Sequence, residues 1–104
     1  MSDIQSTIRE TVDKNRVVLF MKGTKNFPQC GFSARAVELL KKCGAEFKDV
    51  NVLADAELRQ GIKEFSSWPT IPQVYIDGQF VGGSDILFEM FQNGELQKLL
   101  APKS

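Results

Sequence analysis

The sequence contains no histidine. Ser-His-Asp triads, Cys-His nucleophile pairs and zinc sites with imidazole ligands are therefore excluded by composition. Cysteine is also scarce, because Cys30 and Cys43 are the only two in 104 residues. We infer that whatever chemistry the protein performs runs through sulfur.

The chain has no excess of charge of either sign and no long apolar run. Thirteen Lys and Arg residues balance thirteen Asp and Glu residues. The sequence therefore lacks the excess of positive charge that is typical of nucleic-acid binding. The apolar run at residues 17–21 is far too short to span a bilayer, and the N-terminus lacks a hydrophobic signal region. We expect a soluble protein with neither a nucleic-acid nor a membrane partner. A reducing compartment is indicated: the cytoplasm, or an organelle stroma or matrix if this is a mature form.

The two cysteines are not expected to form a disulfide. If residues 31–43 form one helix, thirteen steps of about 1.5 Å separate Cys30 from Cys43 by roughly 20 Å, whereas a disulfide tolerates Cα separations up to about 7 Å. Cys43 shares an apolar helix face with Ala36 and Leu39, which favours core packing. Cys30 lies next to Gly31, in a setting that favours an exposed turn.

The order of the predicted elements indicates an α/β fold. The length suffices for one hydrophobic core, so we expect a single domain over residues 1–104. Hydrophobic periodicity predicts helices at residues 4–14, 31–43, 55–65, 85–92 and 95–100, and strands at 16–21, 46–52, 72–77 and 79–83. A right-handed strand-helix-strand crossover gives a parallel pair, and the hairpin at Asp77-Gly78 adds two antiparallel strands. This predicts a thioredoxin-like fold, with a four-stranded mixed sheet flanked by helices.

The stretch FPQCGFS, residues 27–33, places a lone cysteine at the start of a predicted helix. A Cys-x-x-Cys pair would indicate dithiol redox chemistry, but the second position is Ser33, whose hydroxyl cannot exchange with disulfides. The N-terminus of the helix stabilises a thiolate, and Lys22 adds positive charge if the intervening loop folds back. The pattern predicts one reactive thiol, Cys30.

Two further motifs lie downstream. In WPTIPQ, residues 68–73, Pro72 favours extended geometry at Ile71, whose backbone N–H and C=O are then free to pair with a peptide-like ligand. A structural turn explains the prolines equally well. In GGSD, residues 82–85, successive N–H groups suit a carboxylate, and Asp85 suits an ammonium group. The alternative there is a helix N-cap after a tight turn.

Three basic side chains complete the pattern. Arg59 and Lys63 are four residues apart on one predicted helix face, and Lys22 ends a strand. Singly, each is more often a solvated charge than a ligand. Together with the motifs they indicate a zwitterionic peptide with two carboxylates, one amine and a thiol, which is the chemistry of glutathione.

With Lys22, PQCGFS, Arg59, WPTIPQ and GGSD in this order, nearly the whole chain resembles the monothiol, CGFS-type glutaredoxins. The resemblance implies that Cys30 is the active thiol, that Phe32 lines the site and that Pro72 is a cis proline. It further implies a glutathione site made by Lys22, Cys30, Phe32, Arg59, Ile71, Pro72, Gly83, Ser84 and Asp85. Many members carry a second cysteine where this chain has Ser84, so a mechanism that resolves through that cysteine is not expected.

A single accessible sulfur per chain bears on metal binding. A 2Fe-2S cluster takes four thiolates, so a second chain and two glutathione thiols would complete a set that begins with Cys30. The resemblance implies a homodimer bridged by the cluster, which transfers iron-sulfur clusters to apo recipient proteins, often with a BolA-like partner. The alternative is a glutathione-dependent oxidoreductase that deglutathionylates proteins with Cys30 as nucleophile. A third hypothesis is an interaction module with neither activity.

Overall fold

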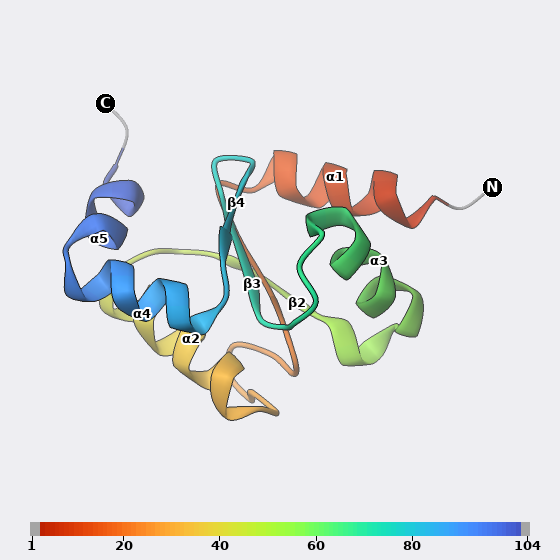
Figure 1. Ribbon diagram of the computed structural model, residues 1–104, viewed down its shortest axis with the longest axis horizontal. Helices are drawn as coiled ribbons and strands as arrows, with labels where there is room; N and C mark the ends of the chain where they lie inside the picture. Colours follow the sequence, from red (N-terminus) through yellow and green to blue (C-terminus); the bar gives the residue numbers. More distant parts are fainter. Residues whose placement is uncertain (1–2, 103–104) are drawn as a thin grey trace.

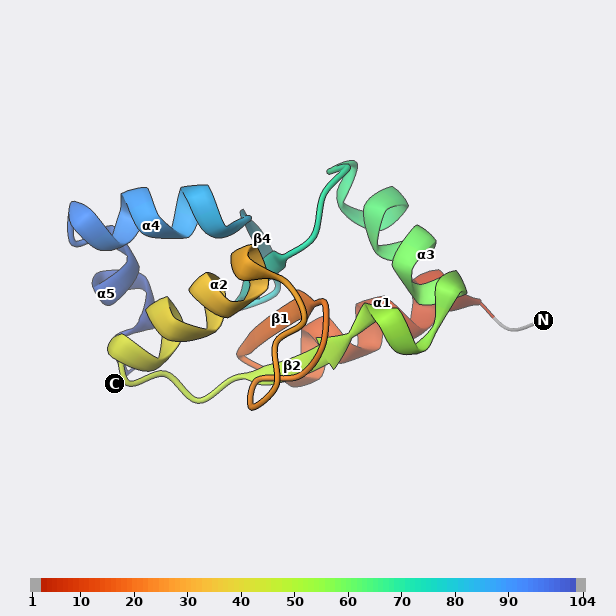
Figure 2. The ribbon, with the colours of Figure 1, turned by 90° about the horizontal axis from the view of Figure 1, so that it is seen from below.

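The computed structural model describes residues 3–102 and contains the predicted elements in the predicted order (Figures 1 and 2). The helices are α1 (Ile4–Lys14), α2 (Gly31–Lys42), α3 (Ala56–Ser66), α4 (Ser84–Gln92) and α5 (Glu95–Leu100), and a short 3-10 helix, η1, spans Val52–Ala54. The strands are β1 (Val17–Met21), β2 (Lys48–Asn51), β3 (Gln73–Ile76) and β4 (Gln79–Gly82). None of the helices described within residues 3–102 is long and apolar enough to cross a membrane.

The four strands form one mixed sheet in the order β2-β1-β3-β4. Strand β1 pairs in parallel with β2 and antiparallel with β3, which in turn pairs antiparallel with β4. Asp77 and Gly78 both have positive φ angles, 53° and 80°, as a two-residue hairpin turn of this twist requires. The predicted thioredoxin-like arrangement is therefore confirmed.

Helices cover both faces of the sheet. Helices α1 and α3 lie on one face, and α2, α4 and α5 lie on the other (Figure 1). Because side chains alternate along a strand, β1 contributes to two cores. Val18 and Phe20 pack in the α1/α3 core, while Leu19 and Met21 pack in the α2/α4 core. This explains why the sequence of β1 reads as a continuous apolar run.

The strand predicted at residues 46–52 is longer than the observed β2. Its ladder with β1 runs only from Lys48 to Asn51. Phe47 packs in the core before the strand begins. At the other end, the Asn51 side chain accepts a hydrogen bond from Leu53 N at 3.0 Å and so starts η1. Since β2 is an edge strand with a single neighbour, pairing with β1 sets its length.

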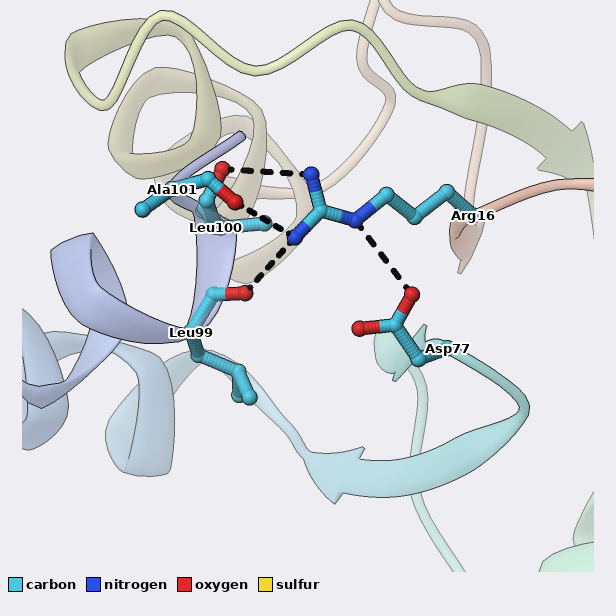
Figure 3. A network of polar contacts seen from close by, with 5 residues as sticks. All are labelled: Arg16, Asp77, Leu99, Leu100 and Ala101. Atoms are coloured by element: carbon cyan, nitrogen blue, oxygen red, sulfur yellow. Dashed lines mark hydrogen bonds and ion pairs between the residues drawn. The ribbon is translucent and has the colours of Figure 1, made fainter. Parts of the chain in front are cut away.

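Arg16, predicted to be in the first strand, instead precedes it and fixes the C-terminal helix (Figure 3). Its guanidinium donates to the carbonyl oxygens of Leu99 (3.1 Å), Leu100 (3.5 Å) and Ala101 (2.7 Å). It also contacts Asp77 at 3.3 Å. A guanidinium suits the C-terminus of a helix, where carbonyl groups lack partners. The contact joins α5 to the hairpin turn.

The two cysteines are free and lie at opposite ends of α2, as the spacing predicted. Cys43 is the C-cap residue, half-buried against the α2/α4 core, and burial raises the pKa of its thiol. Gly44 follows with a φ of 72°, in the left-handed conformation common just after a helix. Cys43 therefore has the surroundings of a packing residue.

Candidate functional site

Cys30 lies at the N-terminus of α2, as predicted, and is half-buried. Partial burial acts to raise the pKa of its thiol. The backbone N–H groups of Ser33 and Phe32, the Ser33 hydroxyl and the charge of Lys22 act in the opposite direction and prevail, so the pKa lies below its ordinary value. The direction in which Lys22 acts agrees with the prediction made from the sequence.

Ser33 occupies the position where a dithiol protein would carry its second cysteine. Its side chain is fully buried, and its Oγ accepts a hydrogen bond from Lys22 N at 3.1 Å. From the sequence, Ser33 was notable only because it stands where a second cysteine would be, and no contact was predicted for it. In the structure it links the N-terminal turn of α2 to the end of β1.

The loop between β1 and α2 folds back on itself. Gln29 N donates to Lys22 O at 2.9 Å, and Gly23 forms a bridge with Pro28. Gly23 has a φ of 90°, and a Cβ there would lie 2.5 Å from Phe27 O, so only glycine fits. The fold of the loop keeps Lys22 near Cys30 and leaves Phe27 75% exposed at the surface.

A cleft of about 620 Å³ lies next to Cys30. It is lined by Lys22, Phe32, Arg59, Lys63, Trp68, Pro69, Thr70, Ile71, Pro72, Gly83, Ser84, Asp85 and Ile86. All the predicted site residues except Cys30 are in this set. Cys30 itself does not line the cleft, but two residues close to it do: Lys22, whose charge acts on the Cys30 thiol, and Phe32, two positions along the chain and 60% exposed.

The charged groups of the cleft are separated by sign. Arg59 and Lys63, one turn apart on α3, and Lys22, beyond β1, supply positive charge. Asp85, in the first turn of α4, supplies negative charge. In the part of the chain that the structure describes, none of these four side chains forms an ion pair with another residue. Their charges are therefore available to a ligand.

The WPTIPQ segment forms one wall of the cleft. The Ile71–Pro72 peptide bond is cis, as the resemblance implied. Between residues 3 and 102 no hydrogen bond uses the backbone of Ile71, which agrees with the prediction that it is free to pair with a ligand. Gln73 is fully buried and donates to Trp68 O (3.1 Å) and Thr70 O (3.2 Å), which fixes the wall.

The GGSD motif opens α4 beside this wall, where a Cβ at Gly83 would lie 3.1 Å from Pro72 O. The N-cap residue is Gly83, which has no side chain to cap the helix. The motif therefore supplies the helix N-cap, as the alternative interpretation held, but without a side-chain hydrogen bond. Ser84 is buried as the first residue of α4, one residue earlier than predicted, and Asp85 is exposed. The N–H groups of this first helical turn lack intrahelical acceptors and border the cleft.

Several residues of the site were not predicted. Trp68 and Thr70 line the cleft, and Trp68 packs against Phe80 with ring centroids 5.6 Å apart. Both residues belong to the WPTIPQ motif, so the sequence could have identified them as site residues. Asn51, whose Oδ1 accepts from Gly23 N at 2.9 Å, and Gln73 support the site from outside the cleft. Nothing near them in the sequence marks these contacts.

Comparisons with known proteins agree with the fold and the motifs. The family model for glutaredoxin matches residues 17–81. A Synechocystis protein named as an uncharacterized monothiol glutaredoxin, ycf64-like, is 58% identical over 98 residues, which cover 94% of this chain and 92% of that protein. The solution structure of reduced apo GrxS14 from poplar is 56% identical, with a TM-score of 0.81 over 91% of this chain and 87% of that chain.

A more distant structure shares the fold alone. A buckwheat glutaredoxin solved as a complex with glutathione is 23% identical, with a TM-score of 0.82 over 93% of this chain and 86% of that chain. The sheet, its flanking helices and these likenesses define a thioredoxin-like glutaredoxin fold. The chain belongs to the glutaredoxin family, and within it to the monothiol glutaredoxins.

Proposed function

We propose that the protein binds glutathione in the cleft beside Cys30. The observation that carries this proposal is the convergence of Lys22, Arg59 and Asp85 on one cleft next to a thiol of lowered pKa. The tripeptide has two carboxylates, one ammonium group and one thiol, so both signs of charge are needed. The buckwheat glutaredoxin that was solved with glutathione has the same fold.

The residues present fit this ligand. One carboxylate suits Lys22 and Arg59, which have no ion-pair partner within residues 3–102. The other suits the N–H groups of Gly83 and Ser84 at the start of α4, with Asp85 accepting from the ammonium group. The free backbone of Ile71 suits the peptide chain, and Phe32 and Pro72 supply apolar contact surface.

We further propose that the bound glutathione serves in carrying a 2Fe-2S cluster. A cluster takes four thiolates, and although both cysteines are half-buried, only Cys30 has a thiol of lowered pKa, so each chain offers one sulfur suited to the cluster. Cys43 is at the far end of α2 with a raised pKa. Two chains and two glutathione molecules complete the set, so the cluster bridges a homodimer. Ligands that exchange make such a cluster easy to release, which suits delivery to apo iron-sulfur proteins.

The proposal extends to partners and location. A BolA-like protein is a candidate for a second partner beside the homodimer, and apo iron-sulfur proteins are the recipients. Cys30 and Cys43 are unpaired, which is consistent with a reducing compartment, either the cytoplasm or an organelle stroma or matrix.

The lowered pKa of Cys30 favours a second candidate, glutathione-dependent reduction of protein-glutathione mixed disulfides. The Cys30 thiolate attacks the glutathione sulfur and releases the protein thiol. A second glutathione thiolate then attacks the Cys30-glutathione disulfide, which frees Cys30 and forms oxidised glutathione. One disulfide is thus exchanged for another: the incoming glutathione thiol is oxidised as the protein thiol is restored, and Ser33 takes no part because it has no thiol.

Anaerobic reconstitution with iron, sulfide and glutathione tests the carrier against the enzyme. We expect a coloured holoprotein whose visible absorption is lost in Cys30→Ser and retained in the matched variant Cys43→Ser. Lys22→Ala and Arg59→Ala should retain less cluster, whereas Lys98→Ala, on α5 and away from the cleft, should behave as wild type. Unchanged retention in both cleft variants would refute the site assignment. Rapid turnover by a colourless monomer would favour the oxidoreductase.

A further inference from the structure

We infer that Ser33 and Asn51 are positioning residues, which hold the two peptide units on either side of Lys22 and so fix the reach of its ammonium group into the cleft. The inference rests on the proposed binding of glutathione. It gives position 33 a function of its own, beyond the absence of a second thiol.

Lys22 is the first residue after β1, where the strand pairing of the sheet has ended. Strand β1 ends at Met21, whose partner in β2 is Asn51, and its pairing with β3 ends one residue earlier, at Phe20. Beyond this point no strand described within residues 3–102 pairs with the backbone groups of Lys22 and Gly23. A cation carried on such a segment would be poorly fixed, because long side chains already have many rotamers.

Side chains replace the missing strand at this point. The Lys22 N–H donates to Ser33 Oγ at 3.1 Å, and the next N–H, that of Gly23, donates to Asn51 Oδ1 at 2.9 Å. The Lys22 carbonyl oxygen accepts from Gln29 N at 2.9 Å. These three backbone groups are therefore paired, and two of the three partners are side-chain oxygens from other elements.

The environment of both residues agrees with this function. Ser33 is fully buried, although serine is usually exposed, and buried polar groups are retained where they have a partner. The Oδ1 of Asn51 also accepts from Leu53 N at 3.0 Å, so this one oxygen joins the loop after β1 to the start of η1. Both oxygens act on the backbone and leave the Lys22 side chain facing the cleft.

Because the Ser33 hydroxyl also acts on Cys30, a single variant cannot separate the two effects. A double-mutant cycle that measures the noncovalent binding of glutathione separates the effect through Lys22 from the effect through Cys30. Reduced glutathione is titrated into the reduced, metal-free protein under anaerobic conditions, and its Kd is measured by calorimetry. The variants are Ser33→Ala, Lys22→Gln and the double variant, and chemical unfolding confirms that each one is folded.

We expect Ser33→Ala to raise the Kd about three- to tenfold, the range of one neutral hydrogen bond, and to have no further effect once Lys22→Gln has removed the cation. Asn51→Ala should behave in the same way. Asn51→Asp, which keeps the accepting oxygen, should bind as wild type. Because Asn51 is on β2 and outside the cleft, the effect of these two substitutions on glutathione binding does not act through the Cys30 thiol.

Additive effects of Ser33→Ala and Lys22→Gln would overturn the inference, since they would show that Ser33 acts on binding without Lys22. Failure of Asn51→Asp to restore binding in a folded protein would count against it equally. If Lys22→Gln alone leaves the Kd unchanged, the proposed glutathione site fails as well. Failure of the glutathione site can be told apart from failure of the inference, because the first is seen in Lys22→Gln alone and the second only in the Ser33 and Asn51 variants.

Discussion

Replacement of Gly23 by alanine tests how tightly the loop before Cys30 is packed. A Cβ at this position would lie 2.5 Å from Phe27 O and 2.7 Å from Gln29 N. Both are backbone atoms of the same loop, so no flexible side chain can move aside. Gly23 also has a φ of 90°, which residues with a Cβ rarely adopt. Gly23→Ala therefore combines backbone strain with overlap.

The two terms can be separated with a matched control. Left-handed backbone costs a residue with a Cβ about 1–2 kcal/mol, and overlap in a packed region adds about 1–3 kcal/mol. Gly94 has a similar φ of 85°, but a Cβ there would meet no atom within 4 Å. We therefore expect Gly94→Ala to lower the free energy of unfolding by about 1–2 kcal/mol, and Gly23→Ala by about 2–5 kcal/mol.

Urea unfolding measures both losses, and a glutathione titration measures the local consequence. The loop has to shift in Gly23→Ala, which disturbs the hydrogen bond from Gly23 N to Asn51 and displaces Lys22. Glutathione binding should weaken in this variant and stay unchanged in Gly94→Ala. Equal losses of stability in the two variants, or wild-type binding by Gly23→Ala, would show that the loop is not held as described.

Three further predictions concern other parts of the molecule. Gln73→Leu removes both hydrogen bonds that fix the cleft wall and should lower the free energy of unfolding by about 2–4 kcal/mol and weaken glutathione binding; wild-type stability in urea would contradict this. Arg16→Lys keeps the charge but loses the forked contacts with α5, so we expect a loss of about 1 kcal/mol with unchanged glutathione binding. Because the pKa of Cys30 is lowered and that of Cys43 is raised, alkylation of Cys30 by iodoacetamide should reach its plateau at lower pH. Coincident pH profiles for the two thiols would refute that assignment.

Much of the fold follows from local patterns. The continuous apolar run of β1 marks a strand buried on both faces, and Asp77-Gly78 marks the hairpin between β3 and β4. The ends of elements were less predictable where a neighbour decides them. Strand β2 stops at Asn51 because its ladder with β1 stops there, although the alternating pattern continues to residue 52.

The residues that line the cleft were largely predictable because most belong to a local motif or are basic residues singled out with those motifs, and the order of the strands brings them together. The residues that hold the lining in place were not. Ser33 contacts Lys22 across 11 positions, and Asn51 contacts Gly23 across 28. Gln73 is part of the quoted motif, yet its hydrogen bonds depend on a loop conformation that the sequence does not specify.

The mass of the reconstituted holoprotein tests the central claim most directly. Native mass spectrometry after anaerobic reconstitution should show two chains, one 2Fe-2S cluster and two glutathione molecules, with a return to the monomer when the cluster is lost. Iron fully coordinated within an isolated subunit would contradict the account. So would the same holo species formed after all low-molecular-weight thiol has been removed.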